Sequence, residues 1–219
     1  MTFDAVLLDL YDTVVWSDWR SWQRLLAGRV GVSLEVMGTA FDDTRPARST
    51  GRHPDADADL ASVLMAAGVV STPDLLVELN TLEAEALTDT VRLYDDSLEV
   101  LRQLRARGVP TALVSNCSWN TRPIVDRLGL EREFDTVVLS FEVGAMKPQP
   151  AIYLEALRRL GDPTPSRSVF VDDQVAYCDG ARAVGLDTRL ILRPEEALEG
   201  RPTSTNGHAI IDTLMPVLD

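Results

Sequence analysis

Five short apolar runs recur along the chain, and each of them is too short to be a helix. They are Ala5–Leu8, Ala112–Val114, Val137–Leu139, Val169–Val171 and Leu190–Leu192. The runs are continuous rather than alternating in polarity, which is typical of strands buried on both faces. This pattern predicts the strands of a parallel sheet.

Helical patterns separate these runs from residue 96 onward, and a glycine follows each of them. The predicted helices are Leu98–Arg107, Thr121–Leu128, Ala151–Leu160 and Val175–Val184. Asp96 or Ser97 is suited to cap the first of these helices, and Pro150 opens the third. Strands that alternate with helices require right-handed crossover connections. The pattern therefore predicts an α/β fold with a doubly wound parallel sheet.

Residues 15–92 interrupt this alternation. They contain no convincing strand but show three helical patterns, Trp16–Ala27, Asp59–Ala67 and Pro73–Thr88. The intervening segment 50–57 is polar and contains proline and glycine, which favours a loop. A helical block placed directly after the first strand is expected to cover the carboxyl end of that strand.

Composition narrows the possible partners. The chain has 219 residues and a formal net charge of −13, which argues against nucleic acid as a partner but not against a small anionic molecule. No apolar run approaches the roughly 20 residues that a membrane helix needs. No basic segment precedes the first apolar run, and two cysteines form no disulfide or zinc pattern. We therefore expect a soluble, cytoplasmic monomer or homodimer with no nucleic-acid or membrane partner.

Polar side chains follow three of the predicted strands at the point where each strand ends. Asp9 follows the first run, Ser115 and Asn116 follow the second, and Asp172 and Asp173 follow the fourth. Ligands of open parallel sheets bind outside the carboxyl ends of the strands, near the position where the strand order reverses. Each residue alone would be an ordinary turn residue, but together they predict a site at this edge.

The third strand leads toward Lys147, which is the single lysine among 21 basic residues. An ammonium is a compact point charge, whereas the guanidinium of arginine is a planar fork. Three carboxylates that converge on one edge repel one another unless a cation joins them, and such oxygen ligands suit Mg²⁺. Ser115 and Asn116 are suited to donate hydrogen bonds to phosphoryl oxygens, and Lys147 to neutralise developing charge.

These motifs together resemble the haloacid dehalogenase-like (HAD) hydrolase superfamily. The residues that carry the resemblance are Asp9-Leu10-Tyr11-Asp12-Thr13, Ser115-Asn116, Lys147-Pro148 and Val171-Asp172-Asp173. Their order and spacing match along nearly the whole chain. The resemblance implies a Rossmann-like core of residues 1–14 and 93–219 and a small helical cap domain of residues 15–92.

The resemblance also implies roles for individual residues. Asp9 is expected to be the nucleophile, with Ser115, Asn116 and Lys147 binding the substrate and stabilising the intermediate. The metal ligands are expected to be Asp9, Asp172 and Asp173, together with the backbone carbonyl of Tyr11. The implied reaction is Mg²⁺-dependent hydrolysis of a small phosphomonoester through an aspartyl-phosphate.

One residue departs from the phosphatase pattern. Tyr11 stands where phosphatases of this superfamily carry a second aspartate that acts as general acid and base. Asp12 follows it, but in an extended segment Asp12 faces the opposite side unless the backbone turns sharply after Leu10. Tyr11 either fills the pocket or donates its phenol in place of the missing acid.

Tyrosine at this position resembles the metal-free haloacid dehalogenases, whereas the adjacent Asp172 and Asp173 resemble magnesium phosphohydrolases. Two carboxylates in a metal-free pocket for an anionic haloacid would repel the substrate. The sequence therefore favours a phosphatase. A metal-independent 2-haloacid dehalogenase and a catalytically weak relative that binds a phosphorylated ligand are the alternatives.

Arginine and tryptophan residues offer further contacts for an anionic substrate. Arg20 lies in an aromatic stretch of the insert that is suited either to hold a leaving group or to pack on the core. Trp119 follows the second motif and is expected to line the pocket or to cap the next helix. Arg45, Arg48 and Arg52 are either anion-attracting residues or ordinary solvated charges.

Overall fold

The computed structural model of the protein describes residues 3–194 and 204–219. Its main sheet has six strands in the order β5-β4-β1-β6-β7-β8, and all neighbouring strands are parallel. The strands are β1 (Ala5–Leu8), β4 (Thr111–Ser115), β5 (Thr136–Leu139), β6 (Ser168–Asp172), β7 (Asp187–Ile191) and β8 (Ala209–Ile211). The five predicted strands are all present, and the predicted α/β class is confirmed.

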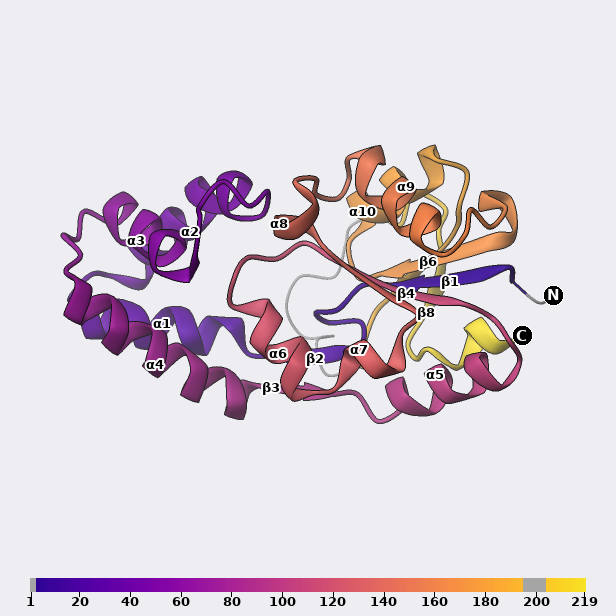
Figure 1. Cartoon of the computed structure of the whole chain (residues 1–219), viewed down its shortest axis with the longest axis horizontal. Coiled ribbons are helices and arrows are strands. Elements are labelled where there is room, and N and C mark those ends of the chain that lie inside the picture. Colours follow the sequence, from indigo (N-terminus) through magenta and orange to yellow (C-terminus); the bar gives the residue numbers. More distant parts are fainter. Residues whose placement is uncertain (1–2, 195–203) are drawn as a thin grey trace.

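Helices cover both faces of this sheet, as Figure 1 shows. They are α5 (Ser97–Ala106), α6 (Thr121–Arg127), α7 (Leu130–Glu133), α8 (Ser140–Val143), α9 (Pro150–Arg159) and α10 (Val175–Ala183). Side chains of β1 alternate between the two layers: Val6 and Leu8 pack with α5, α6 and α7, whereas Ala5 and Leu7 pack with α9 and α10. Burial on both faces explains why the β1 sequence is continuously apolar.

Four helices follow β1 and precede β4 along the chain. In space they lie to one side of the main sheet (Figure 1). They are α1 (Trp19–Val30), α2 (Leu34–Arg48), α3 (Ala56–Ala66) and α4 (Pro73–Thr90). They enclose a hydrophobic cluster of their own, which includes the fully buried Trp22, Leu64 and Leu79. We propose that residues 15–92 act as a cap domain and that the rest of the chain forms the core; residues 1–2 and 195–203 lie outside the described residues.

The prediction of no strand within residues 15–92 is wrong at the two ends of this insert. Strands β2 (Val15–Ser17) and β3 (Val91–Leu93) form an antiparallel ribbon where no strand was expected. Trp16 belongs to this ribbon, and α1 begins three residues later, where Asp18 accepts a hydrogen bond from the Ser21 amide at 3.0 Å. Such short strands carry too few residues to show an alternating pattern.

Helix α2 and strand β8 were not predicted either. Ser33 caps α2, which ends with Pro46 in its last turn, and proline suggests a break when only the sequence is read. Strand β8 has three residues, two of them exposed, so it lacks the buried apolar signal of the other strands. Within the described residues, no helix has both the length and the apolar composition needed to cross a bilayer.

Gly180 of α10 marks a close approach of this helix to the loop that carries Lys147. A Cβ atom at Gly180 would lie 2.6 Å from the carbonyl oxygen of Pro148 and 2.7 Å from its Cβ. We expect Gly180→Ala to lower the free energy of unfolding by about 1–3 kcal/mol, because the backbone of the loop must shift. Chemical denaturation checks this value.

Gly28 provides the matched control. It lies inside α1, and a Cβ atom there would meet nothing within 4 Å. Gly28→Ala is therefore expected to raise the free energy of unfolding by about 0.5–1 kcal/mol, because alanine is the better helix former. Equal effects of the two substitutions would contradict the proposed contact.

Candidate active site

The carboxyl ends of three neighbouring strands bring the predicted site residues together. β1 ends before Asp9, and β4 and β6 end in Ser115 and Asp172. β1 lies between β4 and β6, so the strand order reverses at the strand that leads to Asp9. The Asp9 amide donates to the carbonyl of Val171 at 3.0 Å, which fixes the backbone of Asp9 beside β6. The topology thus places the site where open parallel sheets bind ligands.

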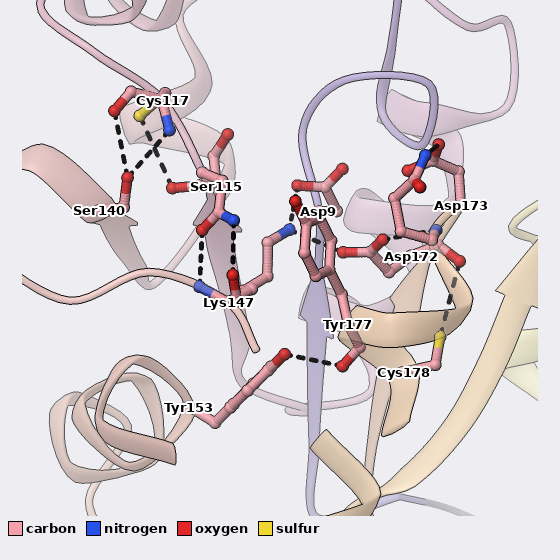
Figure 2. A network of polar contacts seen from close by, with 12 residues as sticks. Asp9, Ser115, Cys117, Ser140, Lys147, Tyr153, Asp172, Asp173, Tyr177 and Cys178 are labelled. Atoms are coloured by element: carbon pink, nitrogen blue, oxygen red, sulfur yellow. Dashed lines mark hydrogen bonds and ion pairs between the residues drawn. The ribbon is translucent and has the colours of Figure 1, made fainter. Parts of the chain in front are cut away.

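Lys147 reaches this edge from the loop after α8, as Figure 2 shows. Its Nζ atom lies 2.5 Å from Oδ1 of Asp9 and 2.7 Å from Oδ2 of Asp172. The side chain is only 1% exposed. Burial works against the charge of the ammonium, but Asp172 and Asp9 outweigh this effect and raise the pKa of Lys147. The lysine is therefore a permanently charged link between the two carboxylates.

Asn116 holds the backbone of Lys147. The Lys147 amide donates to Oδ1 of Asn116 at 2.7 Å, and Nδ2 of Asn116 donates to the Lys147 carbonyl at 2.9 Å. Both ends of the Asn116 amide are thus engaged in positioning the lysine. Asn116 also lines the cavity, and its predicted contact with a phosphoryl oxygen stays a prediction.

Ser115 differs from Asn116 in this respect. Its Oγ atom is buried and has no hydrogen-bond partner among the described residues. A buried hydroxyl without a partner is costly in a folded protein. The free Oγ atom is consistent with the predicted role of Ser115 as a hydrogen-bond donor to a bound ligand.

Three carboxylates lie close together at this edge. One carboxylate oxygen from each of Asp9, Asp172 and Asp173 lies within 4.8 Å of the other two. Burial raises the pKa of Asp173 to about 7, and the charges of Asp9 and Asp12 add to this effect. One ammonium faces three carboxylates, so the donor set and its charge fit a hard divalent cation such as Mg²⁺.

Gln174 orients the two adjacent aspartates. Its backbone amide donates to Oδ1 of Asp172 at 2.8 Å, and its side-chain Nε2 donates to Oδ2 of Asp173. With Lys147 at its other oxygen, Asp172 is held at both ends. Asp172 is therefore chiefly the anchor of the lysine, whereas Asp173 keeps more capacity to hold a cation.

The backbone turns sharply after Leu10, which was the condition for Asp12 to reach the site. The Leu10 carbonyl accepts hydrogen bonds from the amides of Val14 and Val15 at 2.9 and 2.8 Å. Asp12 has a left-handed conformation with φ of 59°. Tyr11 and Asp12 consequently line the same cavity, although they are sequence neighbours.

Tyr11 points toward the start of α6. Its hydroxyl lies 2.9 Å from Oγ1 of Thr121. Burial raises the pKa of Tyr11, so the side chain remains a neutral phenol. Tyr11 therefore fills one wall of the cavity as a neutral phenol.

A cavity of about 320 Å³ lies between these loops and the insert. The insert contributes Trp19 from α1 and Phe41, Arg45 and Arg48 from α2. The rings of Trp19 and Phe41 meet edge to face at 5.5 Å and form an apolar wall. The size of the cavity suits a small metabolite.

Two predicted substrate contacts lie elsewhere. Arg20 is on the exposed side of α1 and does not line the cavity. Trp119 packs against Phe141 at 5.1 Å, and its Nε1 donates to the His53 carbonyl at 3.1 Å. Trp119 thus joins the α2–α3 loop of the insert to the core, because the loop after β4 places it outside the pocket.

A polar network that the sequence analysis missed joins the insert to the core. The guanidinium of Arg48 donates to Asp59 at 2.9 Å and to Ser118 at 3.0 Å. Nδ2 of Asn120 donates to Glu83 of α4 at 2.8 Å. These residue types are common on surfaces, so no sequence signal identifies the network; only the packing of the insert reveals it.

The fold is that of an α/β protein with an acidic site around Asp9 at the carboxyl edge of its sheet. Comparison with known proteins identifies its family. Residues 3–185 match the family model described as haloacid dehalogenase-like hydrolase. The chain belongs to this family of hydrolases, as its motifs predicted.

Two named relatives match part of the chain. A segment of 108 residues is 37% identical to the human haloacid dehalogenase-like hydrolase domain-containing protein 3, over 48% of this chain and 42% of that protein. Ribulose-1,5-bisphosphate 5-phosphatase of Halopiger xanaduensis is 33% identical over 61% of this chain and 59% of that protein. The chain thus spans about half the length of these relatives.

A solved structure covers the chain more completely. The HAD family hydrolase of Deinococcus radiodurans R1 with bound phosphate and sodium is 29% identical, with a TM-score of 0.61 over 96% of this chain and 91% of that one. The L-2-haloacid dehalogenase of Xanthobacter autotrophicus has a TM-score of 0.68 at 18% identity over 99% of this chain and 97% of that one, which shows the shared fold.

Glu83 makes the free energy of unfolding depend on pH. Burial raises the pKa of Glu83 from 4.5 to about 6. A raised carboxyl pKa contributes stability that is fully present below pH 4.5 and is lost as the pH rises through 6. We expect this group to lower the free energy of unfolding by at most about 2 kcal/mol over that range. Glu83→Gln should remove this part of the pH profile, as followed by denaturation between pH 4.5 and 7.5.

Glu85→Gln, at an exposed position on the same helix, is the control and should leave the profile unchanged. A Glu83→Gln profile that is parallel to the wild type would show that Glu83 is not the group responsible.

Proposed function

We propose that the protein is a Mg²⁺-dependent phosphatase that hydrolyses a small phosphomonoester through an aspartyl-phosphate on Asp9. The observation that carries this proposal is the convergence of three carboxylates, two of which are paired with one ammonium. Such a site has an excess of negative charge, and a divalent cation would offset it before an anionic substrate enters. Relatives named as phosphatases and the relative with bound phosphate support the same chemistry.

In the proposed reaction, a carboxylate oxygen of Asp9 attacks phosphorus and the bond from phosphorus to the ester oxygen breaks. The leaving alkoxide takes up a proton. Water then attacks the phosphorus of the aspartyl-phosphate, the bond to Asp9 breaks, and inorganic phosphate leaves. This second step regenerates the carboxylate of Asp9.

Residues around Asp9 would assist both steps. Lys147 neutralises charge that develops on the phosphoryl group, and Ser115 donates its free hydroxyl to a phosphoryl oxygen. Asp9 and Asp173, with Asp172 and the carbonyl of Tyr11, would hold Mg²⁺, which screens the negative charge of the substrate when bound. Of the acids that line the cavity, Asp12 is nearest in sequence to the position of the missing proton donor. We assign the exchange of protons with the leaving group to Asp12 rather than to Tyr11.

The second candidate function is metal-independent 2-haloacid dehalogenation. Tyr11 favours it, and (S)-2-haloacid dehalogenase 2 of Pseudomonas sp. is 30% identical over half of this chain. In that reaction Asp9 would displace halide from carbon and form an ester that water hydrolyses. The acidic pair Asp172 and Asp173 makes an anionic haloacid an unfavourable ligand in the absence of metal.

Two assays separate these functions. We expect release of phosphate from p-nitrophenyl phosphate that requires Mg²⁺ and is lost in Asp9→Asn, because the amide of asparagine is not a nucleophile. Chloride release from 2-chloropropionate that is indifferent to a chelator would establish the dehalogenase instead. Silence in both assays, with Mg²⁺ still raising the melting temperature, would favour a module that binds a phosphorylated ligand.

Lys147→Arg tests the role of the ammonium. The side chain is buried between Asp9 and Asp172, and the larger planar guanidinium does not fit the same space. We expect kcat to fall about 10²- to 10³-fold, as for the loss of a preorganised electrostatic contact. Arg158→Lys, in an exposed ion pair with Glu155, is the control for exchange of the two basic residues. A folded Lys147→Arg enzyme with an unchanged rate would refute the role.

A further inference from the structure

Tyr177 of α10 lies against the charged end of Lys147. The centroid of its ring is 5.1 Å from the Nζ atom of the lysine, and Figure 2 shows this ring beside Asp9. The ring of Phe170, in β6, has its centroid 5.4 Å from the same atom. A cation within about 6 Å of a ring centroid is attracted by the electrons of the ring face. Two rings from different elements thus lie against one ammonium.

The other contacts of Lys147 explain why a ring is suited to this place. An ammonium has three N–H donors, and Asp9 and Asp172 accept from it at 2.5 and 2.7 Å. The side chain is almost fully buried, so water has little access to the rest of the group. A ring face attracts a cation without being charged itself, and this attraction is strongest where water is excluded. A ring can therefore take the place of water beside the ammonium.

The two rings differ in their surroundings. Phe170 is fully buried in the cluster between the sheet and α9 and α10, where its ring meets that of Tyr153 edge to face at 5.3 Å. Tyr177 is only partly buried, at the margin of the same cluster. Core packing accounts for the ring of Phe170, whereas the ring of Tyr177 is an outer layer over the lysine.

Tyr177 is held at both of its ends. Its carbonyl accepts a hydrogen bond from the hydroxyl of Tyr153 at 2.7 Å. Its own hydroxyl accepts one from Nη2 of Arg45 at 3.1 Å, and this contact comes from α2 of the insert. A side chain that is fixed in both places keeps its ring beside the ammonium. The ring is therefore a constant part of the site.

We propose that Tyr177 is a positioning residue, whose ring keeps water from Lys147 and holds the ammonium against Asp9 and Asp172. The part of this inference that concerns catalysis rests on the proposed phosphatase function. A charge that is shielded from water acts more strongly on a reacting group, and a charge already in place needs no rearrangement. Loss of the ring should therefore lower kcat and leave KM nearly unchanged, because the contact acts on the transition state.

Hydrolysis of p-nitrophenyl phosphate in Mg²⁺ measures the effect on catalysis. Tyr177→Leu keeps an apolar side chain but removes the ring. We expect it to lower kcat roughly 5- to 30-fold, as for the loss of a cation–π contact that is shielded from water. Tyr177→Phe keeps the ring and loses only the hydroxyl, so it should restore most of the rate.

Phe3→Leu is the matched control for the removal of a ring beside a cation. The ring centroid of Phe3 lies 5.8 Å from Cζ of Arg189, and Phe3 precedes β1 whereas Asp9 follows it. This cation–ring pair is therefore remote from the site. We expect Phe3→Leu to leave kcat unchanged.

A second measurement follows the lysine itself and needs no turnover. Lys147 is the only lysine of the chain, so labelling with ¹⁵Nζ-lysine gives a single side-chain signal in a nuclear magnetic resonance spectrum. We expect its N–H protons to exchange with water several-fold faster in Tyr177→Leu than in the wild type, because the ring no longer covers the ammonium. Tyr177→Phe and Phe3→Leu should keep the slow exchange. A merely structural role of Tyr177 would not separate the leucine and phenylalanine variants in this way.

Three results would overturn the proposal: wild-type exchange in Tyr177→Leu, the same losses in Tyr177→Phe as in Tyr177→Leu, or the same losses in Phe3→Leu. Melting curves show whether each variant is folded. If Tyr177→Leu is not, Tyr177→Met takes its place with the same expectations. Failure of both to fold would assign the ring to packing and would also overturn the proposal.

The two measurements separate this proposal from the proposed function. If the wild type does not hydrolyse the ester but the exchange pattern is as expected, the phosphatase fails and the shielding of Lys147 stands. If hydrolysis occurs and exchange responds while kcat does not, the effect of the ring on catalysis fails. If hydrolysis occurs and neither measurement responds to Tyr177→Leu, the role of Tyr177 fails and the phosphatase stands.

Discussion

The ion pairs of Lys147 with Asp9 and Asp172 are the interactions on which the rest of the site depends. An ammonium and two carboxylates are removed from water at this position, and removal of ions from water is expensive unless each is paired and hydrogen-bonded. The geometry meets this condition, because Nζ lies within hydrogen-bond distance of both carboxylates. The loss of either partner would leave a buried charge, which typically costs about 3–5 kcal/mol.

The surrounding structure is arranged to hold this lysine in place. Asn116 fixes its backbone with two hydrogen bonds, and the Gln174 amide fixes the far side of Asp172. Gly180 permits α10 to approach Pro148, the residue after the lysine. Elements from four parts of the chain thus restrict one side chain. A rigid charge needs no reorganisation when the reacting group develops charge, and this is the usual source of electrostatic catalysis.

The insert adds the features that distinguish this site from a generic one. Its loop lies directly against the core: Gly51 has a φ of 65°, and a Cβ atom there would lie 1.9 Å from the carbonyl of Phe141. The Trp119 hydrogen bond to His53 and the Arg48 contact with Ser118 act at the same interface. With the insert seated in this way, Arg45 is brought to Tyr177, and the apolar wall lines the same cavity as Tyr11 and Asp12. The position of the insert on the core thus sets the shape of this cavity.

The pattern of residues along the chain was enough to predict the sheet, its class and the residues of the acidic centre. Continuous apolar runs are unambiguous in a sheet that is buried on both faces, and residues that end such strands must meet at one edge whatever the details of packing. For this reason Asp9, Lys147, Ser115 and the pair Asp172 and Asp173 were all identified from their positions along the chain.

The packing of distant segments determines which of these side chains are engaged and which are available. It turned Asp12 into the cavity through a left-handed backbone, assigned the amide of Asn116 to the lysine loop, and placed Arg20 and Trp119 outside the pocket. Hydrogen bonds and charges act over a few ångströms between residues that are far apart in sequence, as with the 132 positions between Arg45 and Tyr177. Local pattern carries no information about such contacts, so the packing of the insert against the core had to supply it.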